Sequence, residues 1–400
     1  MLKNILSELR VLDFTRVLSG PYATRTLADF GAEVIKVQSQ KIARGKPDAG
    51  GYFDTWNRNK RSITLDMSHP EARVTALRLV AICDVVVDNF SPRVMSNWGM
   101  DYQTLKKVKP DIIMLSMSAM GQTGPWRNHV AFGPTVQSLG GLTYLTSFDE
   151  ETPLGSGYAL ADHISGLYGA FAILSAMEHR DRTGQGHYID LSQYEVGASQ
   201  IGPALLDVLA NNQGHLPCGN QPDYVMAAPH GCYPCLGEDQ WCVIGVFSEI
   251  EWQALVQVLG DPGWAHDSKY ATLALRKAHF NQLDEALSKW TSTYTAGEVV
   301  ERLQKAGVSA GVVQNAEDLA NDPHLLDRKF FVQIQHPSLG KTILDRSPIR
   351  FIQDASTDPL SQIDFKSAPI LGEGNQYVYM DLLGMTEQEY RSHIEKGIIA

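Results

Sequence analysis

Short apolar runs separated by longer amphipathic stretches dominate the first half of the chain. These runs are rich in Val, Ile and Leu and are short enough to be buried strands. A glycine-containing turn at 19–21 and a helical stretch at 22–30 join the first two runs, which predicts a strand–helix–strand unit. Such units build parallel sheets, so the expected class is α/β with a Rossmann-like opening. The predicted strands are 10–14, 33–37, 62–66, 84–88, 111–116 and 188–191.

A longer helix is predicted at 164–177, just after Asp162. Small residues such as Gly166 and Gly169 lie one turn apart on it, so a neighbouring backbone could approach closely. Gly184, following basic residues, is expected to end the helix. Asp162 has two interpretations: a helix N-cap, for which Asp is a favoured residue, or a reactive carboxylate kept ionised by the helix N-terminus.

The second half of the chain has a different pattern. Residues 211–222 are polar and rich in Gly and Pro, as in a linker. Beyond them, amphipathic helices and short strands predict a smaller α+β unit, with a capping box at Thr295 and Glu298. We therefore expect a large domain at 1–210, a linker at 211–225, a small domain at 226–330, and at 331–400 a second linker with a return to the large domain.

The charge balance and the apolar runs exclude several classes of protein. A net charge of −11, with 45 acidic against 34 basic residues, argues against nucleic acid or an anionic membrane as partner. No apolar run is long enough to span a bilayer, and Met1–Phe14 lacks the pattern of a signal peptide. Five cysteines without framework spacing favour a reducing compartment, so a cytoplasmic enzyme is expected.

Two cofactor classes are also disfavoured. The first turn lacks the glycine spacing of a nicotinamide-binding fingerprint. Cys232 and Cys235 have zinc-ligand spacing but no matching second pair, so no metal is predicted. Instead, Cys235 and Cys242 are expected on two strands of a hairpin that turns at 237–239.

Candidate binding residues follow two of the predicted strands. Asn89 and Phe90 come directly after the strand at 84–88, at the end where open α/β sheets bind ligands, and Phe90 offers a flat face to a nucleobase. A glycine-hinged loop at 121–125 follows the next strand. A basic stretch could pair with phosphates or could simply be a solvated loop. Its cations are Lys41, Arg44, Lys46, Arg58, Lys60 and Arg61.

Taken together, these segments resemble the family III CoA-transferases, the group of formyl-CoA and carnitine CoA-transferases, over nearly the whole chain. The motifs that carry the resemblance are Val11-Leu-Asp-Phe-Thr15, Ser19-Gly-Pro21, Gly31-Ala-Glu-Val-Ile-Lys36, Asn57-Arg-Asn-Lys-Arg-Ser62, Asp88-Asn-Phe90, Gly121-Gln-Thr-Gly-Pro125, Ala161-Asp162 and Thr183-Gly-Gln-Gly186.

The resemblance implies a site, an architecture and partners. It makes Asp162 the catalytic nucleophile and implies a large Rossmann-like domain formed by both chain ends, a smaller α+β domain, and a homodimer of interlocked chains. The implied partners are an acyl-CoA and a carboxylic acid, with no cofactor beyond coenzyme A itself. The CoA-binding positions that it implies are Val17, Ser19, Asn89, Phe90 and Val94, together with the cations Lys60 and Arg61.

The implied chemistry is covalent catalysis by a carboxylate. Asp162 attacks the acyl-CoA thioester, giving a mixed anhydride and CoA thiolate, and the thiolate then converts the anhydride into an aspartyl-CoA thioester. The acceptor acid reverses these steps. Arg16, Leu18, Gln38 and Asn97 depart from the formyl-CoA branch, which disfavours oxalate and formyl-CoA, and Leu18 points to a bulkier or more hydrophobic acid.

Three alternatives remain open. An α-methylacyl-CoA racemase would need a histidine at 132–133, where this chain has Phe and Gly, while His129 falls about three residues earlier. A non-catalytic CoA-binding subunit of a heteromeric transferase would not need Asp162. The chain could also be the active subunit of such a heteromer.

Overall fold

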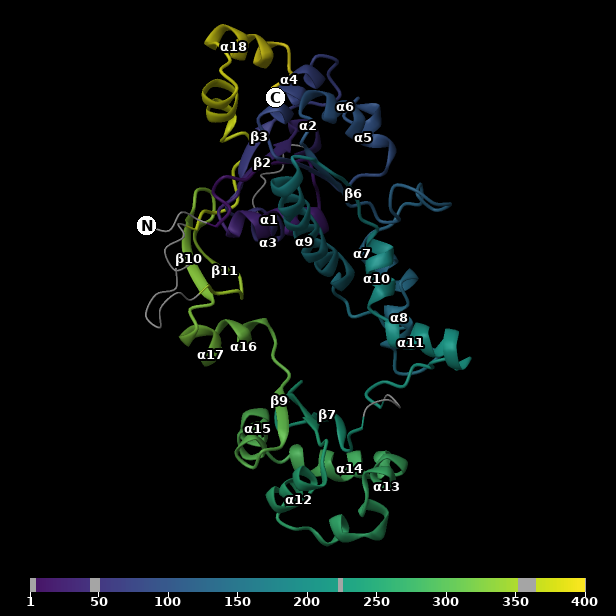
Figure 1. Cartoon of the computed structure of the whole chain (residues 1–400). Coiled ribbons are helices and arrows are strands. Elements are labelled where there is room, and N and C mark those ends of the chain that lie inside the picture. The colour runs from purple at the N-terminus through teal and green to yellow at the C-terminus, as the bar shows by residue number, and fades with distance from the viewer. Residues whose placement is uncertain (1–4, 44–50, 222–225, 352–364, 400) are drawn as a thin grey trace. The chain divides into compact units, whose positions relative to one another are not determined.

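The computed structural model describes residues 5–43, 51–221, 226–351 and 365–399 (Figure 1). It divides into two compact units. The large unit comprises Met1–Thr143, Gly155–His215 and Asp327–Ala400, and the small unit comprises Tyr144–Leu154 and Leu216–Leu326. The excursion at Tyr144–Leu154 has no counterpart in the sequence-based division, which kept residues 1–210 together.

The large unit is built on a six-stranded parallel sheet, as the strand–helix–strand pattern predicted. The strand order is β3-β2-β1-β4-β5-β6, so the chain reverses its direction of travel across the sheet between β1 and β4. In open α/β sheets, ligands bind at this switch point, beyond the carboxyl ends of the strands. The strands are β1 (Arg10–Asp13), β2 (Glu33–Gln38), β3 (Arg61–Thr64), β4 (Val85–Asp88), β5 (Ile113–Ser116) and β6 (Tyr188–Asp190).

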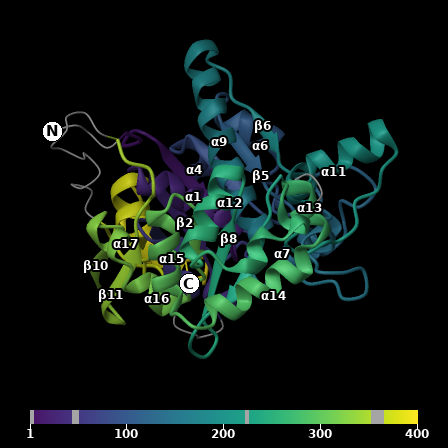
Figure 2. The same ribbon diagram turned by 90° about the horizontal axis from the view of Figure 1, so that it is seen from below.

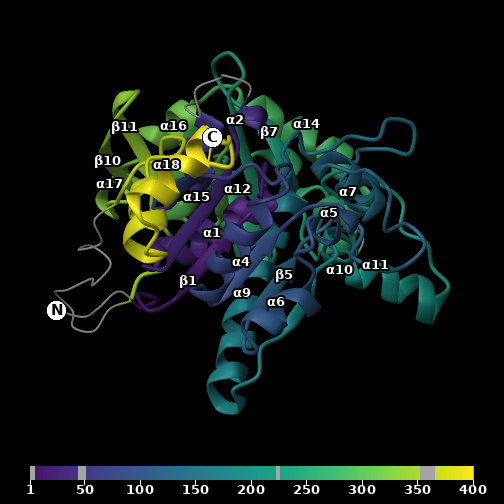
Figure 3. The same cartoon turned by 90° about the horizontal axis from the view of Figure 1, so that it is seen from above.

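Both faces of this sheet are buried, which explains why its strands are continuously apolar. Alternate strand residues enter two cores. Val11 joins Ala23 of α1 (Ser19–Asp29) and Ile173 of α9 (Leu160–Thr183), whereas Leu12 joins Leu79 of α4 (Ala72–Ala81). Helices α1 and α9 lie together on one face (Figures 1 and 3).

Helices connect and cover the strands of the large unit. They are α1 (Ser19–Asp29), α2 (Gln40–Ala43), α3 (Gly51–Asn57), α4 (Ala72–Ala81), α5 (Arg93–Asn97), α6 (Tyr102–Val108), α7 (Gly133–Leu139), α8 (Leu142–Leu145, at the unit boundary), α9 (Leu160–Thr183), α10 (Gln193–Ser199), α11 (Gly202–Leu206), the π-helix η1 (Asp207–Asn211), the π-helix η5 (Tyr377–Leu382) and α18 (Glu387–Glu395).

Helix α9 is longer than the predicted helix at both ends and terminates at left-handed Gly184. The small residues on it have the predicted effect: a Cβ at Gly166 would lie 2.9 Å from the carbonyl oxygen of Ser19, so α1 packs directly on this face. By length and composition, α9 is also a weak candidate for a membrane span. Its buried face against α1, which includes Asp162, instead marks it as a core helix.

The C-terminal segment packs against the N-terminal strands (Figures 1 and 3). Asn375 accepts a hydrogen bond from the Thr64 amide at 2.8 Å, and Tyr379 is fully buried and donates to the Thr64 carbonyl. A hairpin of β10 (Phe331–His336) and β11 (Gly340–Asp345) precedes it. The sequence analysis assigned this hairpin to a linker: only four residues of β10, Val332-Gln-Ile-Gln335, alternate between apolar and polar, and β11 shows no such alternation.

The small unit is an antiparallel sheet of order β7-β8-β9 with helices packed on it (Figure 2). Cys235 and Cys242 lie on the two arms of the β7–β8 hairpin, and Thr295 and Glu298 form a capping box, both as predicted. Its elements are β7 (His230–Pro234), β8 (Trp241–Gly245), α12 (Glu249–Val258), η2 (Gly263–His266), η3 (Ser268–Tyr270), α13 (Leu273–Ala278), α14 (Phe280–Thr291), α15 (Ala296–Lys305), β9 (Ser309–Val312), α16 (Ala316–Ala320) and α17 (Pro323–Asp327, at the unit boundary).

Candidate active site

A pocket of about 440 Å³ lies within the large unit, beyond the carboxyl ends of β1, β4 and β5. The turn 16–19 follows β1, Asn89 and Phe90 follow β4, and residues 118–120 follow β5. The N-terminus of α9 adds Asp162, and the loop before α7 together with the first two residues of that helix supplies Arg127 and residues 129–134. The pocket therefore occupies the switch point at which this sheet topology places ligands.

Asp162 is the sole acidic residue that lines the pocket in the part of the chain that the structure describes. Its carboxylate has no hydrogen-bond or ion-pair partner among those residues, and burial raises its pKa to about 6. Burial therefore opposes the stabilisation that the helix N-terminus was expected to give the ionised form, and a carboxyl group with this pKa is still mostly ionised at neutral pH. The N-cap interpretation is wrong: Ala159 is the N-cap, and Asp162 caps nothing.

Gly133 lies against the carboxylate. A Cβ at Gly133 would overlap Asp162 Oδ2 and would come within 2.8 Å of the Ala159 Cβ. Any side chain here would displace the acid, so glycine keeps space beside Oδ2. This is also the position at which a racemase would need its base, and neither Phe132 nor Gly133 can act as one. His129 does line the pocket, with its ring stacked 5.7 Å from that of Trp126.

The turn after β1 is held in an unusual backbone conformation. Val17 has φ +66°, which a β-branched residue rarely adopts, and such strain concentrates at functional sites. Asn89 fixes the turn from β4: its Oδ1 accepts from the Arg16 amide at 2.8 Å and its Nδ2 donates to the Arg16 carbonyl at 2.7 Å. The predicted residues Val17, Ser19, Asn89 and Phe90 therefore line one pocket with Asp162.

Phe90 lies between two other side chains. The Arg16 guanidinium is 5.1 Å from the centroid of the Phe90 ring, and Trp98 meets the ring edge-on at 5.3 Å. The sequence analysis expected a flat face open to a nucleobase. In the structure Arg16 covers part of that ring, which leaves Phe90 less open than expected.

Three predicted binding residues do not line the pocket: Val94, Lys60 and Arg61. Val94 lies on α5. Lys60 is buried and donates to Asp13 Oδ2, the Thr24 hydroxyl, Asn57 Oδ1 and the Pro21 carbonyl at 2.8–3.1 Å.

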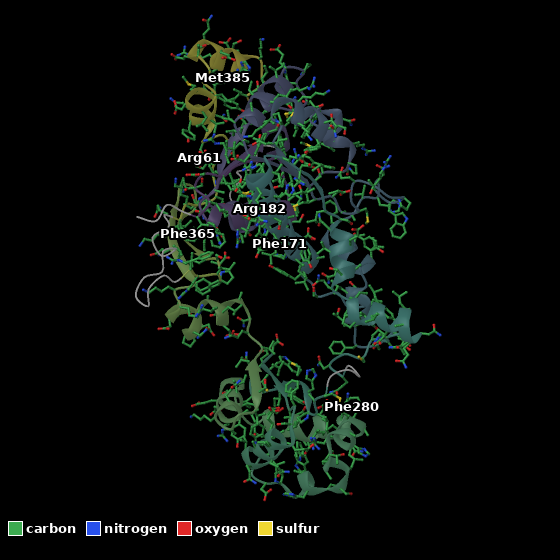
Figure 4. All side chains as sticks on the ribbon, in the orientation of Figure 1. Arg61, Phe171, Arg182, Phe280, Phe365 and Met385 are labelled. Atoms are coloured by element: carbon green, nitrogen blue, oxygen red, sulfur yellow. The ribbon has the colours of Figure 1, made fainter. Side chains whose placement is uncertain are left out.

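The other cations of the basic stretch are also mostly paired. Arg61, labelled in Figure 4, lies 3.3 Å from Glu33 and stacks on Tyr377. Arg58 is buried and pairs with Asp29 and Asp345. Arg58 and Lys60 therefore pair with acidic side chains inside the large unit, where the sequence analysis had considered phosphates as their partners. Lys41 pairs with Asp66, and Arg44 and Lys46 lie outside the described residues.

Tyr158 and His163 pair with each other. His163 Nε2 lies 2.9 Å from the Tyr158 hydroxyl and Nδ1 lies 2.8 Å from the Ala159 carbonyl oxygen, while the two rings stack at 4.5 Å. Neither lines the pocket, in keeping with packing or orienting roles. The sequence analysis overlooked Arg127, His129 and Tyr52 as lining residues; for the first two, their place in the loop after a parallel strand was the usable signal.

The described residues contain no group of three or more His, Cys, Asp and Glu side chains that could bind a metal ion. All five cysteines are free thiols, and burial raises the pKa of Cys232 and of Cys235. The Asp162 carboxylate is the one acidic group among the described residues that line the pocket.

Comparison with known proteins yields consistent matches along the chain. Residues 6–375 match the model of CoA-transferase family III. The chain is 31% identical to a succinyl-CoA–D-citramalate CoA-transferase of Chloroflexus aurantiacus, over 98% of both chains. It is also 31% identical to the beta subunit of a succinyl-CoA–L-malate CoA-transferase of the same organism, again over 98% of both. A crystal structure of a CAIB/BAIF family protein from Brucella suis aligns with TM-score 0.83 and 30% identity, covering 94% of this chain and 99% of that one.

Proposed function

The chain belongs to the family III CoA-transferases, and we propose that it moves CoA from a dicarboxylic acyl-CoA to a free carboxylic acid by way of Asp162. The observation that carries the proposal is the Asp162 carboxylate: it lines a pocket at the sheet's switch point and has no partner among the described residues. A carboxylate without hydrogen bonds keeps its lone pairs available for attack on a carbonyl carbon.

The proposed reaction alternates two covalent states of Asp162. The carboxylate oxygen attacks the thioester carbonyl and CoA leaves as thiolate, which gives an acyl–aspartyl anhydride. The thiolate then attacks the aspartyl carbonyl, the donor acid leaves as carboxylate, and an aspartyl-CoA thioester remains. The acceptor carboxylate attacks that thioester, and the released thiolate finally takes the new acyl group, which regenerates Asp162.

Both named relatives support a dicarboxylic donor, because their names contain succinyl-CoA together with citramalate or malate. Charge in the pocket supports the same class. Asp162 is its one described acid, whereas Arg16, Arg127 and His129 are basic. An anionic substrate with a second carboxylate is therefore favoured over a neutral acyl chain.

We also propose that two chains associate as an interlocked dimer. Helix α9 supports association, because its outer face exposes apolar side chains that a lone chain would leave in water. Phe171, labelled in Figure 4, is 71% exposed. Because one relative is a subunit of a two-subunit enzyme, a different chain is the alternative partner. The other exposed residues of this face are Leu167, Tyr168 and Leu174.

Free cysteines support a cytoplasmic location.

The test is isotope exchange between an acyl-CoA and its own free acid, which needs no knowledge of the natural acceptor. The enzyme is mixed with succinyl-CoA and carbon-13 succinate, and mass spectrometry follows the label into the thioester. Parallel reactions use other acyl-CoA and acid pairs. Label transfer that disappears in Asp162→Asn is expected. Absence of transfer with every pair would contradict the proposal.

One observation keeps a racemase as second candidate: His129 lines the same pocket as Asp162. A base and an acid on opposite sides of an α-carbon could exchange its proton. Deuterium uptake from heavy water into a 2-methylacyl-CoA, without label transfer from a free acid, would identify this activity.

A further inference from the structure

Arg16 is held in place by its neighbours, and its guanidinium forms no ion pair with the described residues. Its backbone is held on both sides by Asn89, and the next residue, Val17, has the strained φ of +66°. Its guanidinium lies over the Phe90 ring at 5.1 Å. A guanidinium held by stacking loses little further freedom when it binds an anion, so this arrangement suits selective recognition.

The buried arginines of the large unit have acidic partners, whereas Arg16 is an exposed residue of the pocket lining. Arg58 pairs with Asp29 and Asp345, and Arg25 pairs with Asp345 at 3.0 Å. Arg16 has no acidic side chain within ion-pair distance among the described residues. Partial burial lowers the pKa of Arg16, and no carboxylate opposes this effect. A charged group left in this state at a pocket wall is ready to pair with an anionic ligand.

Two features decide which anion fits. Arg16 lines the same pocket as Asp162, so a ligand whose acyl carbon meets the carboxylate can also reach toward the guanidinium. Buried Leu18 lies two residues along the same turn and provides an apolar wall for a short carbon chain. A guanidinium fork also matches a planar carboxylate through two parallel N–H···O bonds.

We propose that Arg16 determines substrate class by binding the second, non-reacting carboxylate of a dicarboxylic acyl group while Asp162 attacks its thioester end. This inference rests on the proposed function. Arg16 forms no covalent bond: it binds and orients the substrate. Arg127 and His129 line the pocket from the loop before α7, where His129 stacks on Trp126 at 5.7 Å. Arg16 differs in being held at its backbone by Asn89 as well as at its guanidinium by Phe90.

The test compares a diacid with a monoacid of equal carbon number. Isotope exchange is measured for succinyl-CoA with labelled succinate and for butyryl-CoA with labelled butyrate, in wild type, Arg16→Gln and Arg16→Lys. Lys107→Gln is the matched control, because Lys107 is exposed on α6 and lies outside the pocket. Calorimetric binding of free CoA to each variant reports whether the nucleotide site is intact.

Arg16→Gln is expected to lower succinate exchange about 10–100-fold, the effect of losing one charge-assisted hydrogen-bonded pair. Butyrate exchange and CoA affinity should stay within about threefold of wild type, Arg16→Lys should restore part of the succinate rate, and Lys107→Gln should change nothing.

Three results would overturn the inference. Equal losses for succinate and butyrate with weaker CoA binding would assign Arg16 to a CoA phosphate. Unchanged exchange in Arg16→Gln would leave it without a role in selection. A wild-type enzyme that exchanges butyrate but not succinate would exclude a diacid substrate while leaving CoA transfer intact. Failure of the proposed function is distinct from these results, since wild type would then exchange no acid.

Discussion

Asp13 and Asp162 are both buried carboxylates in the large unit, and their surroundings differ. Asp13 ends β1 and accepts hydrogen bonds from Thr15, Thr24 and Lys60, with Lys36 at 3.8 Å. Burial alone would raise its pKa, but Lys36 and Lys60, with the two hydroxyls, lower it to about 2. Asp162 has no such partners, and burial raises its pKa to about 6.

The difference separates a structural carboxylate from a chemical one. Each oxygen of Asp13 is occupied, so the group holds the end of β1 and the start of α1 together and has no free lone pair toward the pocket. Asp162 is less stable in its ionised form and is open to the pocket. Lack of partners costs folding free energy, and such a cost at a cavity is typical of a reactive group.

Replacement of Asp162 by Asn should have the largest effect. Exchange activity should fall about a thousandfold or more, because the amide cannot form the anhydride. Stability should rise: ionisation of Asp162 opposes folding as the pH increases from about 4 to 6, and removal of that cost is worth about 2 kcal/mol at pH 7. Asp181→Asn, exposed on the same helix, is the control for both measurements. An active Asp162→Asn enzyme would remove the basis of the comparison.

The reverse pattern is expected for Asp13→Asn. Lys60 would remain buried without its ion-pair partner, which should lower the free energy of unfolding by about 3–5 kcal/mol in urea titrations. Exchange activity per folded molecule should persist. Glu71→Gln, which removes an exposed pair with Lys396, should be nearly neutral. Equal stability of Asp13→Asn and wild type would show that the pairing around Asp13 contributes little.

Gly133→Ala should sharpen the comparison without removing any charge. The new Cβ would displace the Asp162 carboxylate, so kcat/KM should fall about 10–100-fold, as expected for a small misplacement of a reacting group. Gly202→Ala is the matched control, because nothing lies within 4 Å of a Cβ built there. If both variants are equally active, the space beside Oδ2 is not needed.

The smallest effect is the pH dependence. Attack needs ionised Asp162, so kcat/KM should rise about tenfold for each pH unit below pH 6 and should level off above pH 6. Stability from Asp13 follows the opposite sign: its lowered pKa makes its contribution full above about pH 4 and lost as the pH falls toward 2. Activity without an inflection near pH 6 would mean that Asp162 ionisation does not limit the reaction.

Much of the fold was predictable because periodicity reports burial. Continuous apolar runs gave the strands of the parallel sheet, and small residues on α9 predicted the close approach of a neighbouring backbone, which the structure shows to be that of α1. The β10–β11 hairpin was missed because only Val332-Gln-Ile-Gln335 alternates between apolar and polar residues, and β11 does not. Helix α9 was predicted too short since the positions before Ile164 carry no helical repeat.

The sequence predicted several residues that line the pocket, but it did not predict the ion pairs of the basic residues. Asp162, Ser19 and Asn89 were found from motifs and strand ends. The ion pair between Lys60 and Asp13 was not predicted. A basic stretch in a sequence does not reveal which of its cations pair with acidic residues on other strands. Nor does sequence order show that Gly133 lies beside Asp162, since helices α7 and α8 and the Tyr144–Leu154 segment of the small unit separate them in the chain.

The central claim, that Asp162 becomes covalently acylated, is tested most directly by trapping. Wild type and Asp162→Asn are mixed with succinyl-CoA and hydroxylamine, and the digested proteins are analysed by mass spectrometry. Hydroxylamine attacks the aspartyl carbonyl of the anhydride or the thioester, so the account predicts a hydroxamate on the wild-type peptide that contains Asp162 and none in the variant. Label transfer with no modified peptide, or a hydroxamate on a different acid, would contradict it.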